Sequence, residues 1–159
     1  MAMNIFFLGR SNTIVDISLF LVRAISGLII FVAGAGKVFG WFGGYGLQKT
    51  LEAFSSMMHT NAFWAYVSCF TELIGGFLLM IGLFTRPAAF FVAINMFVAT
   101  NYVGWENFFS KTGDFPFTLF ICSFVILLCG PGSLSFDALL FRPKKKQGPR
   151  SWSGLQFKI

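Results

Sequence analysis

Charged residues are scarce in this chain. Asp, Glu, Lys and Arg make up 11% of its 159 residues, whereas soluble domains carry about 25%. Hydrophobic residues make up 56% and include 23 phenylalanines, more than a core of this length could keep away from water. This composition excludes an ordinary soluble domain and favours an integral membrane protein whose outer surface contacts lipid.

Residues that bind metals or perform nucleophilic catalysis are also few. His59 is the single histidine, so the chain cannot supply two histidine ligands to a haem or build a histidine-rich metal site. We therefore expect no metal site and no intrinsic cofactor, and the catalytic residues are unknown. The cysteines, Cys69, Cys122 and Cys129, form no C-x-x-C pair, which disfavours a thiol-relay enzyme.

Long apolar runs are abundant. Four of them approach the roughly 17 to 25 residues that cross a bilayer. They run from Ile14 to Phe39, from Ala62 to Phe84, from Pro87 to Val103 and from Phe115 to Cys129. The sequence therefore predicts an all-α polytopic membrane protein, folded as a four-transmembrane-helix bundle.

A further helix is predicted between the first two spans. Apolar residues recur there with helical spacing at Leu47, Leu51, Phe54 and Met58, while the positions between them are largely polar. This pattern is typical of an amphipathic helix that lies on a membrane surface. We expect it on the outer surface.

The distribution of Lys and Arg predicts the orientation. Arg10, Arg86 and six residues of the tail lie on one side of the predicted spans, whereas Lys49 and Lys111 lie on the other. Positively charged loops remain in the cytoplasm. Both termini are therefore expected to be cytoplasmic.

The same pattern divides the chain into three parts. Residues 1–13 form a cytoplasmic N-terminus, 14–141 a single membrane domain and 142–159 a basic cytoplasmic tail. Basic residues beside a span usually contact anionic lipid. We therefore expect membrane lipids as partners and no nucleic acid.

Charged residues within the spans point to an interior ion pair. Asp16, Arg23 and Lys37 recur at multiples of seven residues, so they share one face of the first helix. Counting residues places Arg23 and Glu72 near the middle of the membrane, and we predict that they form a buried ion pair. The pair either fixes helix register or gives Glu72 a role in binding ligand or protons. Asn95, in the third span, is expected to hydrogen-bond between helices.

A candidate pocket lies toward the outer side. Its predicted residues are Lys37, Trp41, Asn101, Tyr102, Trp105 and Glu106. The aromatic side chains would form apolar walls for a ring-shaped ligand such as a quinone. Alternatively, Lys37 extends to the lipid headgroups.

On the cytoplasmic side, Arg86 begins the third span and Asp137 follows the fourth. The predicted topology brings both to one surface, where they could contact each other. The alternative is that Asp137 caps a short helix beginning near Phe136.

Several stretches together resemble the DoxX family of small four-helix membrane proteins. They are LFLVRAISGLIIFVAGAGKVFG, TELIGGFLLMIGLFTRPAA, NYVGWEN and CGPGSLSFD, and the resemblance covers roughly residues 17–137. The family pattern falls on Arg23, Lys37, Glu72, Gly75, Gly76, Arg86, Glu106, Gly130, Gly132, Ser135 and Asp137. The chain departs from the family pattern at one position: it has Asn101 near the outer end of the third span, where many similar proteins look to have a histidine.

The resemblance implies a role in redox assemblies of the bacterial inner (cytoplasmic) membrane, since the family name is linked to the membrane subunit of a thiosulfate:quinone oxidoreductase. The expected protein is an anchor subunit with a quinone-facing cavity, bound to protein partners and not catalytic alone. The alternatives are a non-catalytic scaffold or assembly subunit, and a small-solute or proton transporter.

Overall fold

The computed structural model describes residues 13–58, 61–103 and 114–141, and all regular structure in these ranges is helical. The helices are α1 (Thr13–Phe39), the 3₁₀ turn η1 (Trp41–Gly43), α2 (Gly46–Met58), α3 (Ala62–Phe70), the π turn η2 (Thr71–Gly75), α4 (Gly76–Ile81), α5 (Thr85–Val103), α6 (Asp114–Cys129) and α7 (Phe136–Phe141). The predicted all-α class is confirmed. The helices begin and end within a few residues of the four predicted apolar runs.

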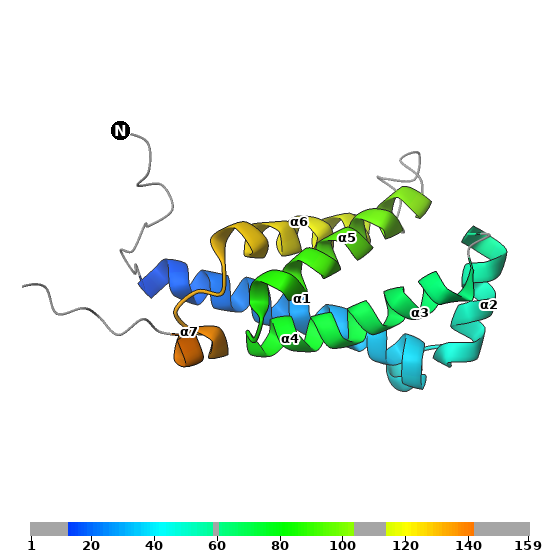
Figure 1. The fold of residues 1–159 in the computed structure, drawn as a ribbon, viewed down its shortest axis with the longest axis horizontal. Coiled ribbons are helices and arrows are strands. Elements are labelled where there is room, and N and C mark those ends of the chain that lie inside the picture. Colours follow the sequence, from blue (N-terminus) through cyan, green and yellow to red (C-terminus); the bar gives the residue numbers. More distant parts are fainter. Residues whose placement is uncertain (1–12, 59–60, 104–113, 142–159) are drawn as a thin grey trace, which may run out of the picture.

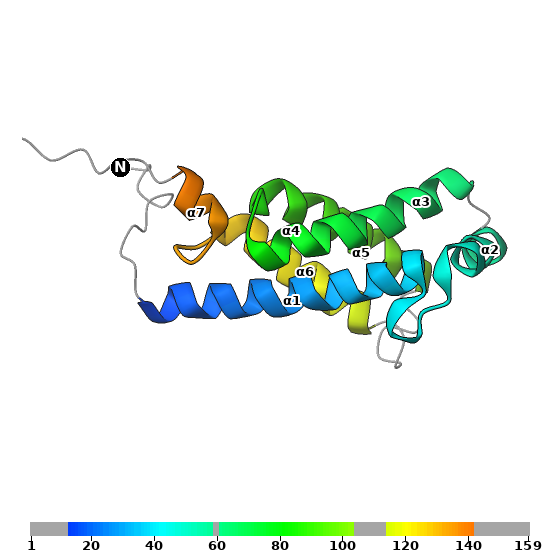
Figure 2. The same cartoon turned by 90° about the horizontal axis from the view of Figure 1, so that it is seen from below.

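The long helices pack side by side along one axis (Figure 1). Helices α3, η2 and α4 continue one another as a single rod that lies along α1, and α5 pairs with α6. The short helices lie at opposite ends of this bundle, α2 at one and α7 at the other (Figures 1 and 2). The two ends are therefore built differently, and each carries a cluster of polar side chains.

Two of the helical segments are long and apolar enough to cross a membrane, judged by length and composition. They are Ile14–Phe39 and the rod Ala62–Ile81; α6 is apolar but shorter. The predicted bundle of four spans is thus supported in its helical architecture, while four crossings remain an interpretation.

Large apolar side chains cover the outside of the bundle. Ile25, Phe70 and Phe91, for example, are 55%, 44% and 59% exposed, while the buried core is built largely from smaller residues such as Ala89 and Val92. In water, such a surface would be a strong aggregation liability. It is typical of a protein whose outer surface contacts hydrocarbon.

Helix α2 has the predicted amphipathic character. Leu47, Leu51 and Phe54 are half-buried, whereas Gln48 and Lys49 are exposed. Its apolar side packs against α1 and α3, so it closes one end of the bundle (Figure 2). Its position on a membrane surface stays a prediction.

Glycines set the register between α1 and the rod. A Cβ added at Gly34 would lie 2.5 Å from the amide nitrogen of Leu73, and one added at Gly27 would lie 2.5 Å from that of Met80. Small residues let helix backbones approach this closely. Because Gly27 and Gly34 have no side chain, α1 can pack here directly on the backbone of η2 and α4, and this contact determines which residues face each other.

This contact predicts that a Gly→Ala change in α1 lowers the stability of the protein, the opposite of its usual effect in a helix. An exposed helical Gly→Ala change normally stabilises a helix by about 0.5–1 kcal/mol. We expect Gly34→Ala to destabilise the protein by about 1–3 kcal/mol, because the methyl group would push α1 away from Leu73. Unfolding by SDS in mixed micelles, followed by circular dichroism, measures the change.

The control is Leu28→Ala, which alters a half-exposed residue of the same helix. It should shift the free energy of unfolding by less than about 0.5 kcal/mol. A Gly34→Ala protein as stable as the wild type would contradict the close contact.

Candidate functional site

A partly buried ion pair joins α1 to the π turn. The Lys37 Nζ lies 2.6 Å from Oε1 and 2.7 Å from Oε2 of Glu72. The Asn95 Nδ2, on α5, donates a third hydrogen bond to Glu72 Oε1 over 3.2 Å. Glu72 is 3% exposed, so these donors compensate for the cost of removing its carboxylate from water. The predicted interhelical role of Asn95 is confirmed.

The predicted Arg23–Glu72 ion pair is wrong. Arg23 lies 14 residues before Lys37, which is about 21 Å along an α-helix. The contact of Gly34 with the Glu72–Leu73 backbone puts the next turn of α1, which carries Lys37, beside the carboxylate. The carboxylate is therefore paired with the other basic residue on the predicted face of α1.

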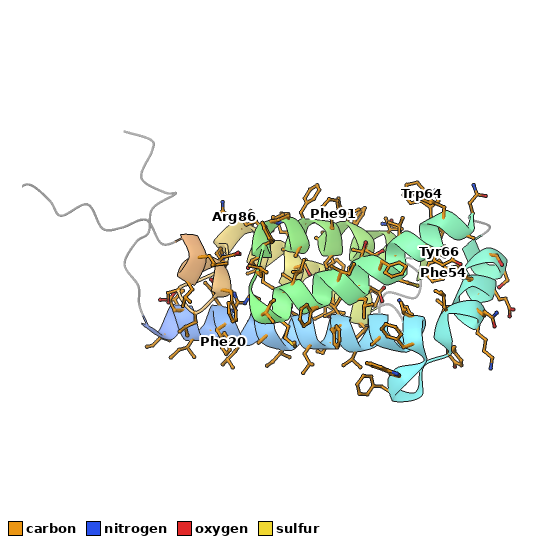
Figure 3. The ribbon with its side chains drawn as sticks, turned by 60° about the horizontal axis from the view of Figure 1, so that its bottom comes forward. Phe20, Phe54, Trp64, Tyr66, Arg86 and Phe91 are labelled. Carbon is orange, nitrogen blue, oxygen red and sulfur yellow. The ribbon has the colours of Figure 1, made fainter. Side chains whose placement is uncertain are left out.

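Arg23 instead binds backbone at the α7 end of the bundle. Its Nη1 donates to the carbonyl oxygen of Pro131 over 3.0 Å, and its Nη2 donates to that of Leu134 over 2.8 Å. The guanidinium also lies 5.7 Å from the centre of the Phe20 ring, and Figure 3 places Phe20 near this end. Arg23 is 2% exposed. Its contacts are thus with the chain's own turns.

The turn between α4 and α5 completes this cluster. Gly82 has a φ of 75°, and the guanidinium of Arg23 occupies the space that a Cβ at Gly82 would need. The carbonyl oxygen of Gly82 accepts a hydrogen bond of 3.0 Å from the amide of Asp137. The motifs GLFTR and GPGSLSFD, which are distant in the sequence, therefore meet around Arg23.

Asp137 caps α5. Its Oδ1 accepts a hydrogen bond from the Phe84 amide and its Oδ2 accepts one from the Thr85 amide, both over 2.8 Å. A carboxylate at a helix N-terminus satisfies unpaired N–H groups and interacts favourably with the helix dipole. Asp137 also interacts electrostatically with Arg23.

Both predictions for Asp137 need correction. Its carboxylate is occupied by the Phe84 and Thr85 amides and forms no ion pair with Arg86, for the one ion pair among the described residues is Lys37–Glu72. Arg86 lies close to the backbone of Gly130 instead. The short helix α7 does begin at Phe136, but Ser135 caps it: the Ser135 Oγ accepts a hydrogen bond of 3.0 Å from the Ala138 amide.

A cavity of about 620 Å³ adjoins the Lys37–Glu72 pair. Lys37, Glu72 and Asn95 contribute charged and amide groups to its lining, Ser68, Thr71 and Tyr102 contribute hydroxyls, and the other lining side chains are apolar or aromatic. Helix α2 contributes Phe54 and α3 contributes Trp64, which Figure 3 places toward the same end of the bundle. We call this space the outer cavity.

The outer cavity contains part of the predicted pocket. Lys37 and Tyr102 line it, whereas Trp41 and Asn101 do not. Trp41 is 56% exposed and packs on Phe39 with ring centres 5.0 Å apart. Trp105 and Glu106 lie outside the described residues.

Sequence reasoning missed Trp64 and Phe54 as lining residues. Trp64 lies in the first turn of the second predicted span, so its depth could be predicted from the sequence. The face of the helix that it occupies could not be predicted. Among the described residues, no group of three or more His, Cys, Asp or Glu side chains is placed to hold a metal ion.

The geometry defines a small helical protein with an apolar exterior, a partly buried Lys–Glu pair at one end and an arginine-centred cluster at the other. The family model for DoxX matches residues 18–105, more than half of the chain, so the chain belongs to the DoxX family. The family is membrane-associated. The matched region contains Lys37, Glu72 and Asn95.

A Bacillus subtilis (strain 168) protein named "Putative oxidoreductase CatD" is 32% identical over 134 residues. The alignment covers 84% of this chain and 95% of that protein. No solved structure matches.

The corrected pairing can be tested by coupling energies. We expect Lys37→Met and Glu72→Gln to be coupled by more than about 0.5 kcal/mol in the free energy of unfolding, because their side chains are in contact. Arg23→Met and Glu72→Gln should be additive to within about 0.5 kcal/mol. SDS unfolding of the single and double variants measures both cycles.

If Arg23→Met does not fold, Arg23→Lys keeps the charge and serves in its place. Strong coupling between position 23 and Glu72 would contradict the observed geometry.

The cap on α5 generates a second prediction. Asp137→Ala should destabilise the protein by about 1–2 kcal/mol, since two amides lose their acceptor. It should also increase hydrogen exchange at the Phe84 and Thr85 amides, measured by NMR. Glu52→Ala, which changes an exposed acidic residue of α2, is the control and should alter neither. Unchanged exchange at Phe84 and Thr85 would argue against the cap.

Proposed function

We propose that this protein is the integral membrane component of a redox-linked assembly and that its outer cavity binds the ring of a quinone. The α1, α3–α4, α5 and α6 segments would cross the bilayer, which agrees with their exposed apolar side chains. Membership of the DoxX family and the name of the Bacillus subtilis relative support a redox connection.

The observation that carries this proposal is the composition of the outer cavity. A charged pair and an amide lie at the wall of a largely apolar space of about 620 Å³, which suits a flat ring with polar edges. Lys37 has three ammonium protons, and the two carboxylate oxygens of Glu72 accept two of them, so one donor remains for a quinone oxygen. The Lys37 side chain is 34% exposed, which leaves it accessible from the cavity.

Aromatic side chains would hold the ring itself. Trp64 lines the cavity from α3, and Phe91 and Tyr102 line it from α5, with Phe91 nearer the start of that helix (Figure 3). Offset stacking on such side chains stabilises bound rings. The Glu72 carboxylate would hold the Lys37 ammonium in place beside the quinone oxygen.

In this proposal, a protein partner carries the redox centre that exchanges electrons with the quinone. Both termini would be in the cytoplasm of a bacterial cell, with the basic residues 142–159 near anionic lipid. The outer cavity would then lie toward the opposite face of the inner membrane.

A scaffold function is the second candidate. It is favoured by the cluster around Arg23, whose contacts join α1 to the 131–134 turn and, through Gly82 and Asp137, to the start of α5. These interactions are with the chain's own backbone, so their role is to hold the fold together. The protein would then assemble a larger membrane complex and bind no quinone.

Quinone binding can be measured by quenching of tryptophan fluorescence in the purified full chain. We expect saturable quenching by decylubiquinone in nanodiscs. Lys37→Ala should weaken binding about 10- to 100-fold, the equivalent of losing one hydrogen bond to a charged group. Trp64→Phe should remove most of the quenching, because Trp64 lines the cavity.

Two variants control for non-specific quenching. Lys49→Ala changes an exposed lysine of α2, and Trp41→Phe changes an exposed tryptophan outside the cavity. Both should bind quinone as the wild type does. Quenching that is insensitive to Lys37→Ala would refute the ring site. A stoichiometric complex that contains no quinone and fails to assemble with Glu72→Gln would favour the scaffold.

A further inference from the structure

A second hollow lies on the flank of the bundle. It has a volume of about 590 Å³ and runs between the α3–η2–α4 rod and the first half of α5. Its lining is almost wholly apolar and includes Ile74, Leu78 and Pro87. We call it the lateral groove.

The lateral groove adjoins the outer cavity. Val67, Thr71 and Phe91 line both spaces, so these residues mark the boundary where the two meet. Val67 and Phe91 are 40% and 59% exposed, so the boundary is itself open to the surroundings of the bundle. One molecule could therefore occupy both spaces.

The two spaces differ sharply in chemistry. The outer cavity has Lys37, Glu72 and Asn95 in its wall, while the lateral groove has Thr71 as its only residue with a polar side chain. From Thr71 to Leu78 the groove follows the rod for about 10 Å, at about 1.5 Å per residue. This division matches an amphiphile with a polar ring at one end and a hydrocarbon chain at the other.

The arrangement also indicates the route of entry. Helix α2 covers the end of the outer cavity, where Phe54 forms part of the lining. The rim of the lateral groove is exposed instead, with Ile74 at 54% and Phe84 at 56%. A ligand dissolved in hydrocarbon would reach the cavity from the side, between the rod and α5.

We propose that the lateral groove holds the hydrocarbon chain of a long-chain quinone whose ring occupies the outer cavity. The identity of the ring rests on the function proposed above, while the chain site rests on the groove and on the three lining residues that it shares with the cavity. The protein thus selects quinones that carry a chain over those that lack one, and it receives them directly from the lipid phase.

The expected preference is moderate. Hydrocarbon is as apolar as the groove, so the chain gains no hydrophobic free energy when it leaves the bilayer. The gain comes from contacts with fixed side chains and from alignment of the ring. We expect the chain to tighten binding about 3- to 10-fold when quinone concentration is expressed per lipid.

The experiment compares two quinones that share one ring: ubiquinone-0, which has no chain, and decylubiquinone. Quenching of tryptophan fluorescence is measured with the full chain in nanodiscs of phosphatidylcholine and phosphatidylglycerol, with each quinone's partitioning determined in empty nanodiscs. Ile74→Phe adds bulk to the exposed lining of the groove. Ile25→Phe is the matched control, because Ile25 is 55% exposed on α1 and lines neither space.

We expect Ile74→Phe to abolish the preference for decylubiquinone and to leave the binding of ubiquinone-0 unchanged, while Ile25→Phe retains the preference. A preference that survives Ile74→Phe would overturn the chain site. Equal weakening of both quinones by Ile74→Phe would overturn it as well, since the variant would then act on the ring.

The two proposals fail in different ways. If the chain preference responds to Ile74→Phe but neither quinone responds to Lys37→Ala, the ring site is wrong and the groove remains as a chain site. If Lys37→Ala weakens both quinones and the two bind equally, the ring site remains and the chain site is wrong.

Discussion

The guanidinium of Arg23 is held by backbone carbonyls of the turn that follows α6, and it rests on Gly82 in the turn between α4 and α5. Asp137 extends the same cluster by capping α5 and by donating its own amide to Gly82. Three segments distant in the sequence are therefore joined to the first half of α1. Because α1 is a single long helix, fixing Arg23 also fixes where Lys37, 14 residues later, meets the rod.

Much of this architecture follows from the apolar runs. Their lengths gave the helices α1, α5, α6 and the α3–α4 rod to within a few residues, and the spacing of Leu47, Leu51 and Phe54 predicted α2. Periodicity also placed Arg23 and Lys37 on the inward face of α1. These features depend on hydrophobic patterning and helical geometry, which are local and can be read from one sequence.

The pairing across helices could not be read in the same way. Counting from the helix ends put Arg23 and Glu72 at similar depths, but the packing of Gly34 on the backbone of η2 sets a different register and brings Lys37 to Glu72. Asp137 was misjudged for a related reason, since its partners are backbone amides 52 and 53 residues away. Backbone groups have no signature in the sequence, so interactions with them escape prediction from side-chain types.

The π turn η2 interrupts an otherwise regular rod and contains Glu72. Such turns widen a helix locally and are frequent at functional positions. A π turn holds one more residue than the α-helical turn it replaces, so loss of one residue between 71 and 75 would restore a regular ladder and leave α4 in nearly the same direction relative to α3. The loss would act locally, at the widened turn that places Glu72 against Lys37 and Asn95. The extra residue therefore belongs to the construction of the carboxylate site, and the rest of the rod does not need it.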